Sequence, residues 1–201
     1  MKKLLPAILL LSFSSLAVLA QSRDNPPPPP LLYLAPAKAE IKEFVSKEHN
    51  FSVAFPGVPK AEVKQAKDAR ESVFKVYRQG SYSVVTVWEF KNDAEKRREE
   101  FLKKYRESIL NTSPPFGGRQ MLKPSIISEN DIQIGKYKGK EFAYEADIKF
   151  TRTLLLFAGK RIYEIKADVT NWHILREYQK NKAEDFLKEA ERFFNSFKLL
   201  N

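Results

Sequence analysis

The sequence predicts an α+β fold in which an antiparallel β-sheet lies between helices, a three-layer α/β/α arrangement. Two blocks of short strand-like segments are each followed by a segment whose apolar residues recur at helical spacing. Residues 82–90 place apolar side chains on both faces of a strand, which is typical of a strand covered on both sides. Helices packed on the two faces of one sheet would provide that cover.

The first block of strands precedes the first helix. We expect short strands over residues 41–46, 51–55, 61–67, 71–78 and 82–90. The sequence Gln-Gly-Ser at 79–81 predicts a tight turn between the last two of these strands. They should therefore pair as an antiparallel hairpin.

Two helices are predicted from the same start signal. The segments NDAE at 92–95 and NKAE at 181–184 each place an asparagine three residues before a glutamate, a pattern of helix N-termini. Apolar residues then follow at helical spacing. They are Phe101, Leu102, Tyr105, Ile109 and Leu110 in the first segment, and Phe186, Leu187, Ala190, Phe193, Phe194 and Phe197 in the second. We expect the phenylalanines of the second segment to lie in the core.

Four more strands are expected between the helices, over residues 125–134, 140–150, 153–157 and 161–169. Glycine-containing turns at 135–139 and 158–160 would join them into an antiparallel meander. The order along the chain is therefore a block of strands, a helix, a second block of strands and a closing helix.

Acidic residues recur along two of these strands, with Glu145 and Asp147 in one and Glu164 and Asp168 in the other. They could form a catalytic cluster or the polar side of a sheet. Each acid falls on the face opposite the aromatic residues of its own strand, among lysines and arginines. Basic neighbours keep carboxylates ionised, and cross-strand pairs of opposite charge stabilise a sheet. We therefore expect ion pairs on a solvated or helix-rimmed strip, without a catalytic role.

The N-terminal region predicts export. Residues 1–20 combine two lysines, an apolar stretch and small residues, the pattern of a secretory signal peptide. An uncleaved membrane anchor is the alternative, but the apolar stretch is shorter than the roughly 20 residues that a bilayer crossing needs. Residues 21–38 contain the run Pro26–Pro30 and predict an extended linker. Residues 39–201 should form one folded domain, periplasmic or secreted, with no transmembrane segment after signal cleavage.

The composition narrows the possible functions. A chain without cysteine cannot be a lipoprotein, form disulfides or use a thiol nucleophile. The net charge of +10 favours an anionic partner, although basic and acidic residues are interleaved along the chain. We expect a protein or an anionic envelope component as the partner, with no nucleic acid and no cofactor. The composition does not predict an oligomeric state.

Motifs of catalysis are not evident in the sequence. The two histidines, His49 and His173, have no acidic residue at metal-ligand spacing, and no Gly-x-Ser-x-Gly elbow or phosphate loop is found. The sequence therefore predicts a protein that is not an enzyme. A hydrolase, in which His173 would meet Glu164 or Asp168, is the third hypothesis, behind two kinds of binding protein.

Two loops carry the candidate contact residues. Phe116 and Arg119 lie in the glycine-containing loop 112–120, and Trp172 and His173 follow the last predicted strand. Loops on a rigid scaffold often carry binding residues, so these four side chains could contact a ligand or a partner. The alternative is that Phe116 and Trp172 cover the ends of the core.

Four segments resemble a group of small exported bacterial domains with the PsbP-like fold. They are FSVAFPGVP at 51–59, GKYKGKEF at 135–142, RTLLLFAGKRIYEIKA at 152–167 and FFNSFKL at 193–199. The resemblance spans roughly residues 41–200 and implies an antiparallel sheet between helices, with no active site to carry over. It implies a non-catalytic binding or assembly module. The alternative function is small-molecule binding in an apolar cleft between the sheet and a helix.

Overall fold

The computed structural model describes residues 40–65, 68–78, 80–111, 123–146 and 148–200. The predicted signal peptide and linker, the candidate residues Phe116 and Arg119, and the acidic residue Asp147 lie outside the described residues. Within these ranges, no helix is both long and apolar enough to cross a bilayer.

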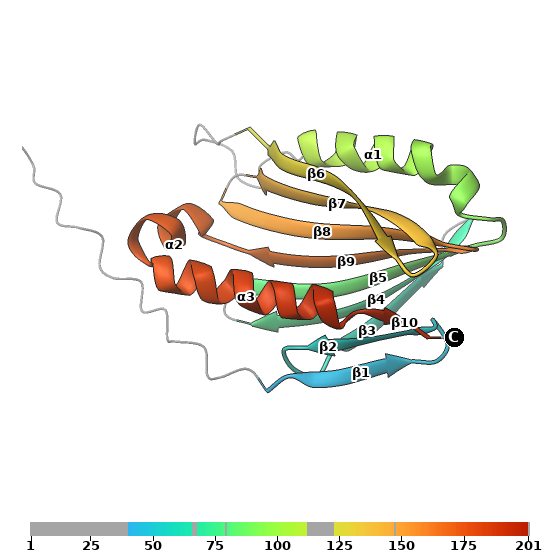
Figure 1. Cartoon of the computed structure of the whole chain (residues 1–201), viewed down its shortest axis with the longest axis horizontal. Helices are drawn as coiled ribbons and strands as arrows, with labels where there is room; N and C mark the ends of the chain where they lie inside the picture. Colours follow the sequence, from blue (N-terminus) through green and yellow to red (C-terminus); the bar gives the residue numbers. More distant parts are fainter. Residues whose placement is uncertain (1–39, 66–67, 79, 112–122, 147, 201) are drawn as a thin grey trace, which may run out of the picture. The chain divides into compact units, whose positions relative to one another are not determined.

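Seven strands form one large antiparallel sheet in the order β3-β4-β5-β9-β8-β7-β6 (Figure 1). Their bounds are β3 Lys60–Gln65, β4 Ala69–Arg78, β5 Ser81–Phe90, β6 Ser125–Ile134, β7 Tyr137–Ala146, β8 Lys149–Ala158 and β9 Arg161–Val169. The hairpins β4–β5, β6–β7 and β8–β9 form where turn signals were predicted. The pairing of β5 with β9 joins the two blocks of strands at the middle of the sheet.

A second sheet has three strands in the order β1-β2-β10, namely β1 Lys42–Ser46, β2 Phe51–Phe55 and β10 Lys198–Leu199 (Figure 1). The central strand is apolar and almost wholly buried. The α+β class and the antiparallel pairing are thus confirmed, whereas the expected single sheet is not. Residues near the two ends of the described chain pair with each other instead of joining the large sheet.

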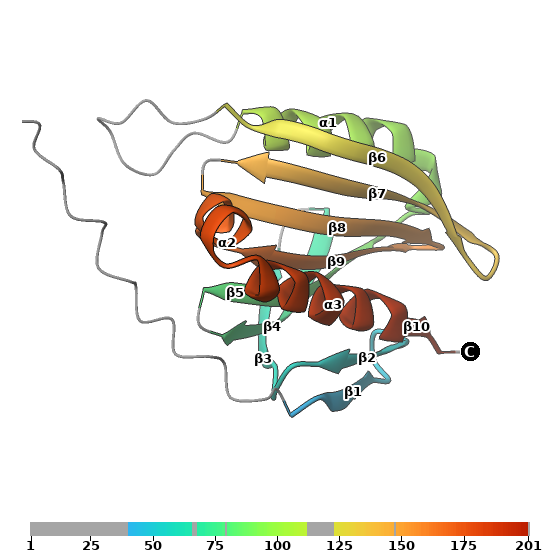
Figure 2. The same ribbon diagram turned by 60° about the vertical axis from the view of Figure 1, so that its left-hand side comes forward.

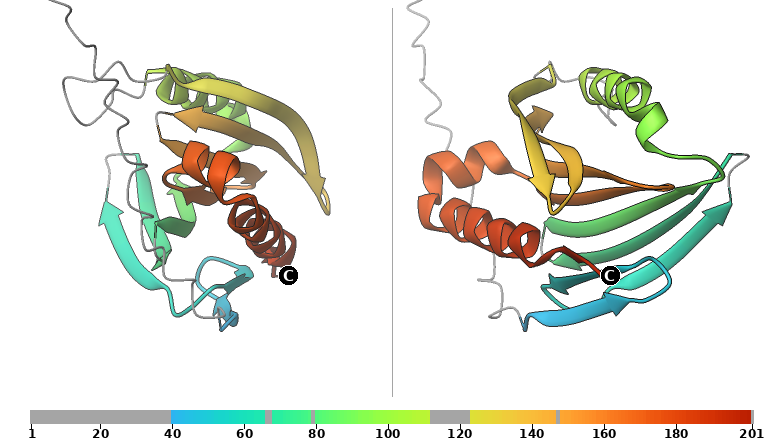
Figure 3. Two further views of the ribbon diagram at one scale, coloured as in Figure 1. Left: turned by 90° about the vertical axis from the view of Figure 1, so that its left-hand side faces the viewer. Right: turned by 45° about the vertical axis from the view of Figure 1, so that its right-hand side comes forward.

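The helices are η1 Glu95–Arg97, α1 Arg98–Leu110, α2 Trp172–Tyr178 and α3 Lys180–Ser196 (Figure 2). Alternate residues of β9 show which elements cover the large sheet. Ile162 joins a buried cluster with Leu102 and Ile109 of α1, while Tyr163 joins a cluster with Phe193 of α3 and the small sheet. We call these two faces the α1 side and the α3 side, and Figure 3 shows the two helices on opposite sides of the sheet.

The burial of the strands explains their apolar pattern. Val84, Val85, Thr86 and Val87 of β5 are all at most 9% exposed, as expected for a strand covered on both faces. Phe193, Phe194 and Phe197 are buried as predicted, whereas Leu110 and Leu187 of the two helical stripes are exposed. β3, at the edge of the large sheet, is exposed along its whole length.

The predicted helix starts need correction. At the first, Asp93 and not Asn92 caps the chain, because its Oδ1 accepts a hydrogen bond from the Glu95 backbone N–H at 3.0 Å. A turn of 3₁₀-helix then precedes α1. At the second, Asn181 is already helical, because α3 follows directly on α2, a short helix that the sequence analysis took for a loop.

The predicted strand over 140–150 is also wrong, because β7 ends at Ala146 and β8 begins at Lys149. The chain turns between them, and the residues after the turn face differently from the pattern of one continuous strand. Phe142 packs on the α1 side, whereas Phe150 packs against Trp172 on the α3 side. Continuous alternation of apolar residues across the turn concealed it.

Candidate binding site

The four acidic residues that drew attention in the sequence do not form a cluster. Glu145 of β7 lies opposite Phe150 of β8, and Phe150 lies opposite Val169 of β9, so these three residues share the α3 side. Glu164 and Asp168 alternate with the α3-side residues of β9 and therefore lie on the α1 side. Glu145 therefore lies on the opposite face of the sheet from Glu164 and Asp168. Asp147 is outside the described residues.

The acids on the α3 side make the cross-strand and tertiary contacts that were expected. Glu141 forms an ion pair with Arg152 of the neighbouring strand. Glu145 accepts a hydrogen bond from the indole Nε1–H of Trp172 at 2.9 Å and lies 3.4 Å from the Arg176 guanidinium. Glu145 thus holds the chain after β9 against the sheet.

Glu164 is buried next to α1, which fits the helix-rimmed alternative of the predicted strip and not the solvated one. Its side chain is 7% exposed and accepts a hydrogen bond from the Tyr105 hydroxyl of α1 at 2.7 Å. Burial, together with the nearby Glu164 carboxylate, raises the pKa of Tyr105 well above its usual value. Lys166 lies 3.8 Å from Glu164, and that carboxylate raises the pKa of the lysine. Tyr105 and Glu164 therefore fasten α1 to the sheet.

Trp172 and His173 are neighbours at the start of α2, and the structure places them in different surroundings. Trp172 is 8% exposed, with its ring stacked on Phe150 at a centroid distance of 4.6 Å. These contacts match the alternative that Trp172 covers the core. His173 is exposed, and α2 packs on the α3 side, away from Glu164. The imidazole and carboxylate that a hydrolase would need thus lie on opposite sides of the sheet.

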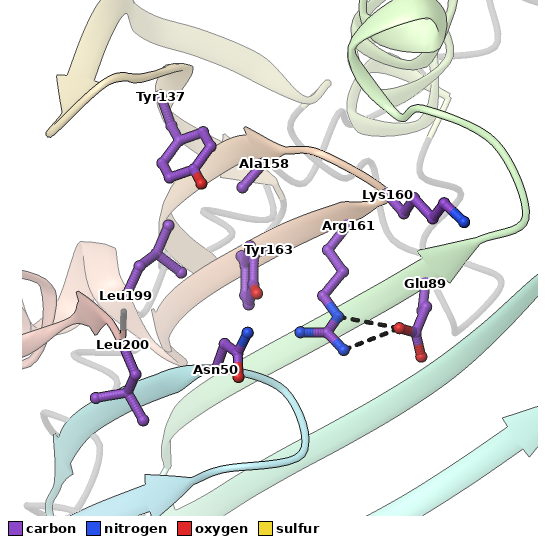
Figure 4. Close-up of a pocket in the computed structure, with 9 residues that line it drawn as sticks. All are labelled: Asn50, Glu89, Tyr137, Ala158, Lys160, Arg161, Tyr163, Leu199 and Leu200. Carbon is purple, nitrogen blue, oxygen red and sulfur yellow. Dashed lines mark hydrogen bonds and ion pairs between the residues drawn. The ribbon is translucent and has the colours of Figure 1, made fainter.

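A hollow at one end of the large sheet brings together residues from both sheets (Figure 4). It has a volume of about 260 Å³ and lies where the β8–β9 turn meets β5, β7 and the chain near β10. Its lining is Asn50, Glu89, Tyr137, Ala158, Lys160, Arg161, Tyr163, Leu199 and Leu200. Because two cations line it against one carboxylate, we call it the basic hollow.

Arg161, the first residue of β9, is held in place on the floor of the basic hollow. Its Nε and Nη2 donate hydrogen bonds to Glu89 Oε1 at 3.2 and 2.9 Å, and Nη2 also donates to the Glu48 backbone oxygen at 3.0 Å. The third nitrogen, Nη1, points away from Glu89 toward Asn50 and Tyr163 (Figure 4). Tyr163 is a further side-chain hydrogen-bond partner of Arg161, so the guanidinium is held on several sides and loses little side-chain freedom on binding.

The β1–β2 turn forms a rigid wall of the basic hollow. The Tyr163 hydroxyl donates a hydrogen bond to the His49 backbone oxygen at 2.7 Å, and the Leu200 backbone N–H donates to the Asn50 oxygen at 2.9 Å. Asn50 has a φ of 55°, a left-handed conformation that asparagine tolerates better than most residues. The His49 side chain is buried behind this turn, 3% exposed, against Phe74.

This arrangement suits recognition of an anionic group. Guanidinium groups form strong, charge-assisted hydrogen bonds with carboxylates, and Arg161 already makes two of them, both to one oxygen of Glu89. Lys160 is exposed at the rim and adds a second positive charge, while Tyr137 and Asn50 add polar groups to the opposite wall. Leu199 and Leu200 give the hollow an apolar side.

The sequence analysis missed the basic hollow because its residues are far apart in the chain. Lys160 and Arg161 were visible only as the end of a predicted hairpin, and Glu89 as the end of a strand. The pairing of β5 with β9, which places Glu89 opposite Arg161, cannot be read from periodicity. A basic pair beside a glycine turn was the only local signal.

Comparison with solved structures identifies the fold. The structure matches the solution structure of cyanobacterial PsbP (CyanoP) from Synechocystis sp. PCC 6803, with a TM-score of 0.50, 7% sequence identity, and coverage of 81% of this chain and 94% of that chain. A crystal structure from Bacteroides thetaiotaomicron VPI-5482 matches with a TM-score of 0.40 and 13% identity over 80% of this chain and 48% of that chain. No protein-family model matches the sequence, and neither does any curated protein. The chain thus has a PsbP-like fold, as the sequence resemblance suggested.

Proposed function

We propose that this chain is an exported, non-catalytic binding module that recognises a carboxylate-bearing group of a protein or envelope component in the basic hollow. The observation that carries the proposal is the Arg161 guanidinium, which is fixed by Glu89 and by the Glu48 backbone while its Nη1 faces the hollow. Export is part of the proposal and rests on the signal-peptide pattern of residues 1–20.

The pairing of the charged groups in the basic hollow supports binding rather than catalysis. Glu89, the carboxylate of the basic hollow, is bound to Arg161 on two nitrogens and is therefore poorly placed to take a proton from a substrate. An anion that enters the hollow would instead meet Lys160 and the Nη1 side of Arg161, next to Tyr163. Each charge-assisted hydrogen bond of this kind contributes about 1.5–3 kcal/mol when water is partly excluded.

The four residues proposed from the sequence remain candidate contacts of a larger partner. Phe116 and Arg119 would act from their loop, and His173 from the exposed face of α2. Trp172 would act by positioning α2, since its indole is bound to Glu145 and stacked on Phe150.

The proposal is tested with a blocked tripeptide that carries a single carboxylate, N-acetyl-Gly-Glu-Gly-amide. Titration followed by ¹H–¹⁵N NMR should move the signals of Asn50, Lys160 and Arg161, and the matched glutamine peptide should not move them. Lys160→Glu should weaken binding about tenfold, which corresponds to about 1.4 kcal/mol. Lys188→Glu, which changes the net charge equally on the exposed face of α3, should change the affinity less than twofold. Equal effects of the two variants would contradict the proposal.

A further inference from the structure

Strand β3 leaves one edge of the large sheet open. It pairs with β4 over six residues without a shift in register, and no other strand among the described residues pairs with it. All six of its residues are exposed. An edge strand presents a row of unpaired backbone N–H and C=O groups, and these can pair with a strand of another molecule.

The opposite edge of the sheet, β6, is protected against such pairing. The register between β6 and β7 shifts between Ile126 and Ser128, and a shift of this kind bends an edge strand. Glu129 of β6 also forms an ion pair with Arg106 of α1, so a helix lies beside this strand. Bulges and covering helices prevent association between sheet edges. Strand β3 has a regular register and full exposure instead.

Charged side chains on an edge also deter association, and in β3 their order is informative. Lys60, Glu62 and Lys64 alternate in sign along the α1 side of the strand. Val63, which is 55% exposed, lies between them on the α3 side. Such a strand repels a partner strand of uniform positive charge, and it attracts one whose charges alternate in the opposite phase.

Two copies of β3 can supply that opposite phase for each other. Directly opposed residues of an antiparallel pair lie on the same face, so a symmetric pair of identical strands is centred on a residue. A pair centred on Glu62 would oppose glutamate to glutamate and lysine to lysine. A pair centred on Val63 opposes each Glu62 to Lys64 of the other copy and the two valines to each other. Centres nearer the ends of β3 would pair at most three of its residues.

We infer that two copies of this chain associate through β3, in an antiparallel, two-fold pairing of residues 61–65 that is centred on Val63. Glu62 already contacts Lys75 of β4 at 2.6 Å, and the two side chains are 48% and 37% exposed. A carboxylate has two oxygens, so Glu62 can bind a lysine of each copy. The inference goes beyond the proposed function and does not depend on the ligand of the basic hollow.

The size of this contact sets its strength. Specific, stable interfaces bury about 1,200–2,000 Å² or more, and the pairing of five residues buries less. The dimer should therefore be weak, forming at high protein concentration and dissociating on dilution. Because opposed residues share a face, the α3 sides of both copies, with their basic hollows, would lie on one face of a continuous sheet. If the proposed function holds, a partner with repeated acidic groups could then be bound by both copies at once.

The test is sedimentation equilibrium of the full chain from micromolar to millimolar concentration. The weight-average mass should rise from that of one chain toward that of two. Glu62→Lys opposes lysine to lysine and Lys64→Glu opposes glutamate to glutamate, so each variant alone should associate at least about tenfold more weakly. An equimolar mixture of the two should associate within about threefold of the unaltered chain, because both charged pairs of a mixed dimer join a lysine to a glutamate. Lys188→Glu is the control and should associate like the unaltered chain.

Each contrary result has a distinct meaning. A full chain that keeps the mass of one chain at every concentration would overturn the inference. Equal association of Lys64→Glu and Lys188→Glu would place the contact elsewhere on the molecule, and a mixture no better than its components would exclude the pairing centred on Val63. Hydrogen exchange at the lowest concentration tests for another occupant. Protection of every amide from 61 to 65 there would mean that another part of the same chain already covers the edge, and the inference would be wrong.

Discussion

Glu89 binds the edge of the Arg161 guanidinium that lies opposite the Nη1 side. Its Oε1 accepts hydrogen bonds from two nitrogens of the guanidinium. A side chain in this position prevents Arg161 from being an unpaired, partly buried cation in the absence of a ligand, which would be unfavourable. Its negative charge also repels an anion that approaches the other side of the guanidinium.

We predict that Glu89→Gln strengthens the binding of the single-glutamate tripeptide about three- to tenfold. The amide keeps the shape of the side chain but removes its negative charge, so the ligand carboxylate at Arg161 meets less repulsion. NMR titration of the variant measures the change. Glu184→Gln, on the exposed face of α3, is the control and should alter the affinity less than twofold. Weaker binding by Glu89→Gln would mean that Glu89 positions Arg161 more than it repels the ligand.

His49 is the buried member of the two histidines. Burial lowers the pKa of its imidazole, and the nearby Arg161 and Arg70 lower it further against the opposing effect of Glu48. The unfolded chain binds a proton at this residue near pH 6.5, whereas the folded chain binds it only at lower pH. The folded state is therefore fully favoured above pH 6.5, and its stability falls as the pH decreases from there toward the lower folded pKa.

We predict that His49→Gln flattens this dependence. Urea unfolding at pH 7.5, 6.5 and 5.5 should show that the unfolding free energy of the unaltered chain falls as the pH decreases, and that it falls clearly less in the variant. The measured quantity is the slope of the unfolding free energy against pH, so a general loss of stability in His49→Gln does not obscure it. His173→Gln is the matched control. If it flattens the curve as much as His49→Gln does, the assignment to the buried imidazole is wrong.

At the residue scale, the sequence predicted well which side chains are buried, but it predicted poorly which side chains contact each other through hydrogen bonds. The alternation of residues 82–90 indicated that both faces of β5 are covered, which the burial of Val84 to Val87 confirms. Polar contacts such as that of Tyr105 with Glu164 join elements that are 59 residues apart. No local pattern marks such a pair, so the sequence left open whether Glu164 is solvated or lies beside a helix.

At the scale of elements, the turn at 135–139 shows how two glycines with the same sequence signal serve different purposes. Gly135 has a φ of 60° and lies in the turn itself. Gly139 lies within β7, where a Cβ would overlap the Leu155 backbone oxygen and come within 3.0 Å of the Ile132 side chain. The sequence analysis assigned both to one five-residue turn, because a glycine needed for space looks the same as one needed for a positive φ.

We predict that Gly139→Ala lowers the unfolding free energy by about 1–3 kcal/mol, since the neighbouring strand must shift to admit the methyl group. Gly135→Asn should cost less than about 1 kcal/mol, because asparagine tolerates the left-handed conformation and nothing crowds that position. Chemical denaturation of the two variants measures the difference. A larger loss in Gly135→Asn would show that the turn, and not the close approach of β7 and β8, limits stability.

Local sequence patterns predicted the two longer helices but not the shortest one, which depends on contacts with distant residues. The helical spacing of apolar residues correctly located α1 and α3. It did not reveal α2, which has only seven residues and follows Asn171 in a left-handed conformation. A helix this short is stable because Trp172 and Leu175 are buried against the sheet, and that packing is tertiary information.

At the scale of the whole molecule, hairpins between neighbours in sequence were predictable and long-range pairings were not. Periodicity and turn signals predicted the order of the elements: two blocks of strands, the helix between them and the closing helix. They did not predict which strands pair with β5 and β10, because alternation indicates which residues face a core but not which strand lies alongside. The basic hollow depends on both of these pairings, so it could not be predicted.

We predict that a chain of residues 39–201 has the same midpoint of thermal unfolding as the full chain, within about 3 °C. Among the described residues, side chains between Phe44 and Leu199 already form the three buried clusters. Differential scanning calorimetry of both chains measures the midpoints. A fall of 8 °C or more in the shorter chain would show that the predicted linker stabilises the domain.

The late position of β9 and β10 also governs when the molecule can fold as it is synthesised. The middle of the large sheet is incomplete until β9 has left the ribosome, and the small sheet is incomplete until residue 199 has done so. Most of the nascent polypeptide therefore waits without its native partners, and its apolar strands stay exposed to aggregation until the last two strands arrive.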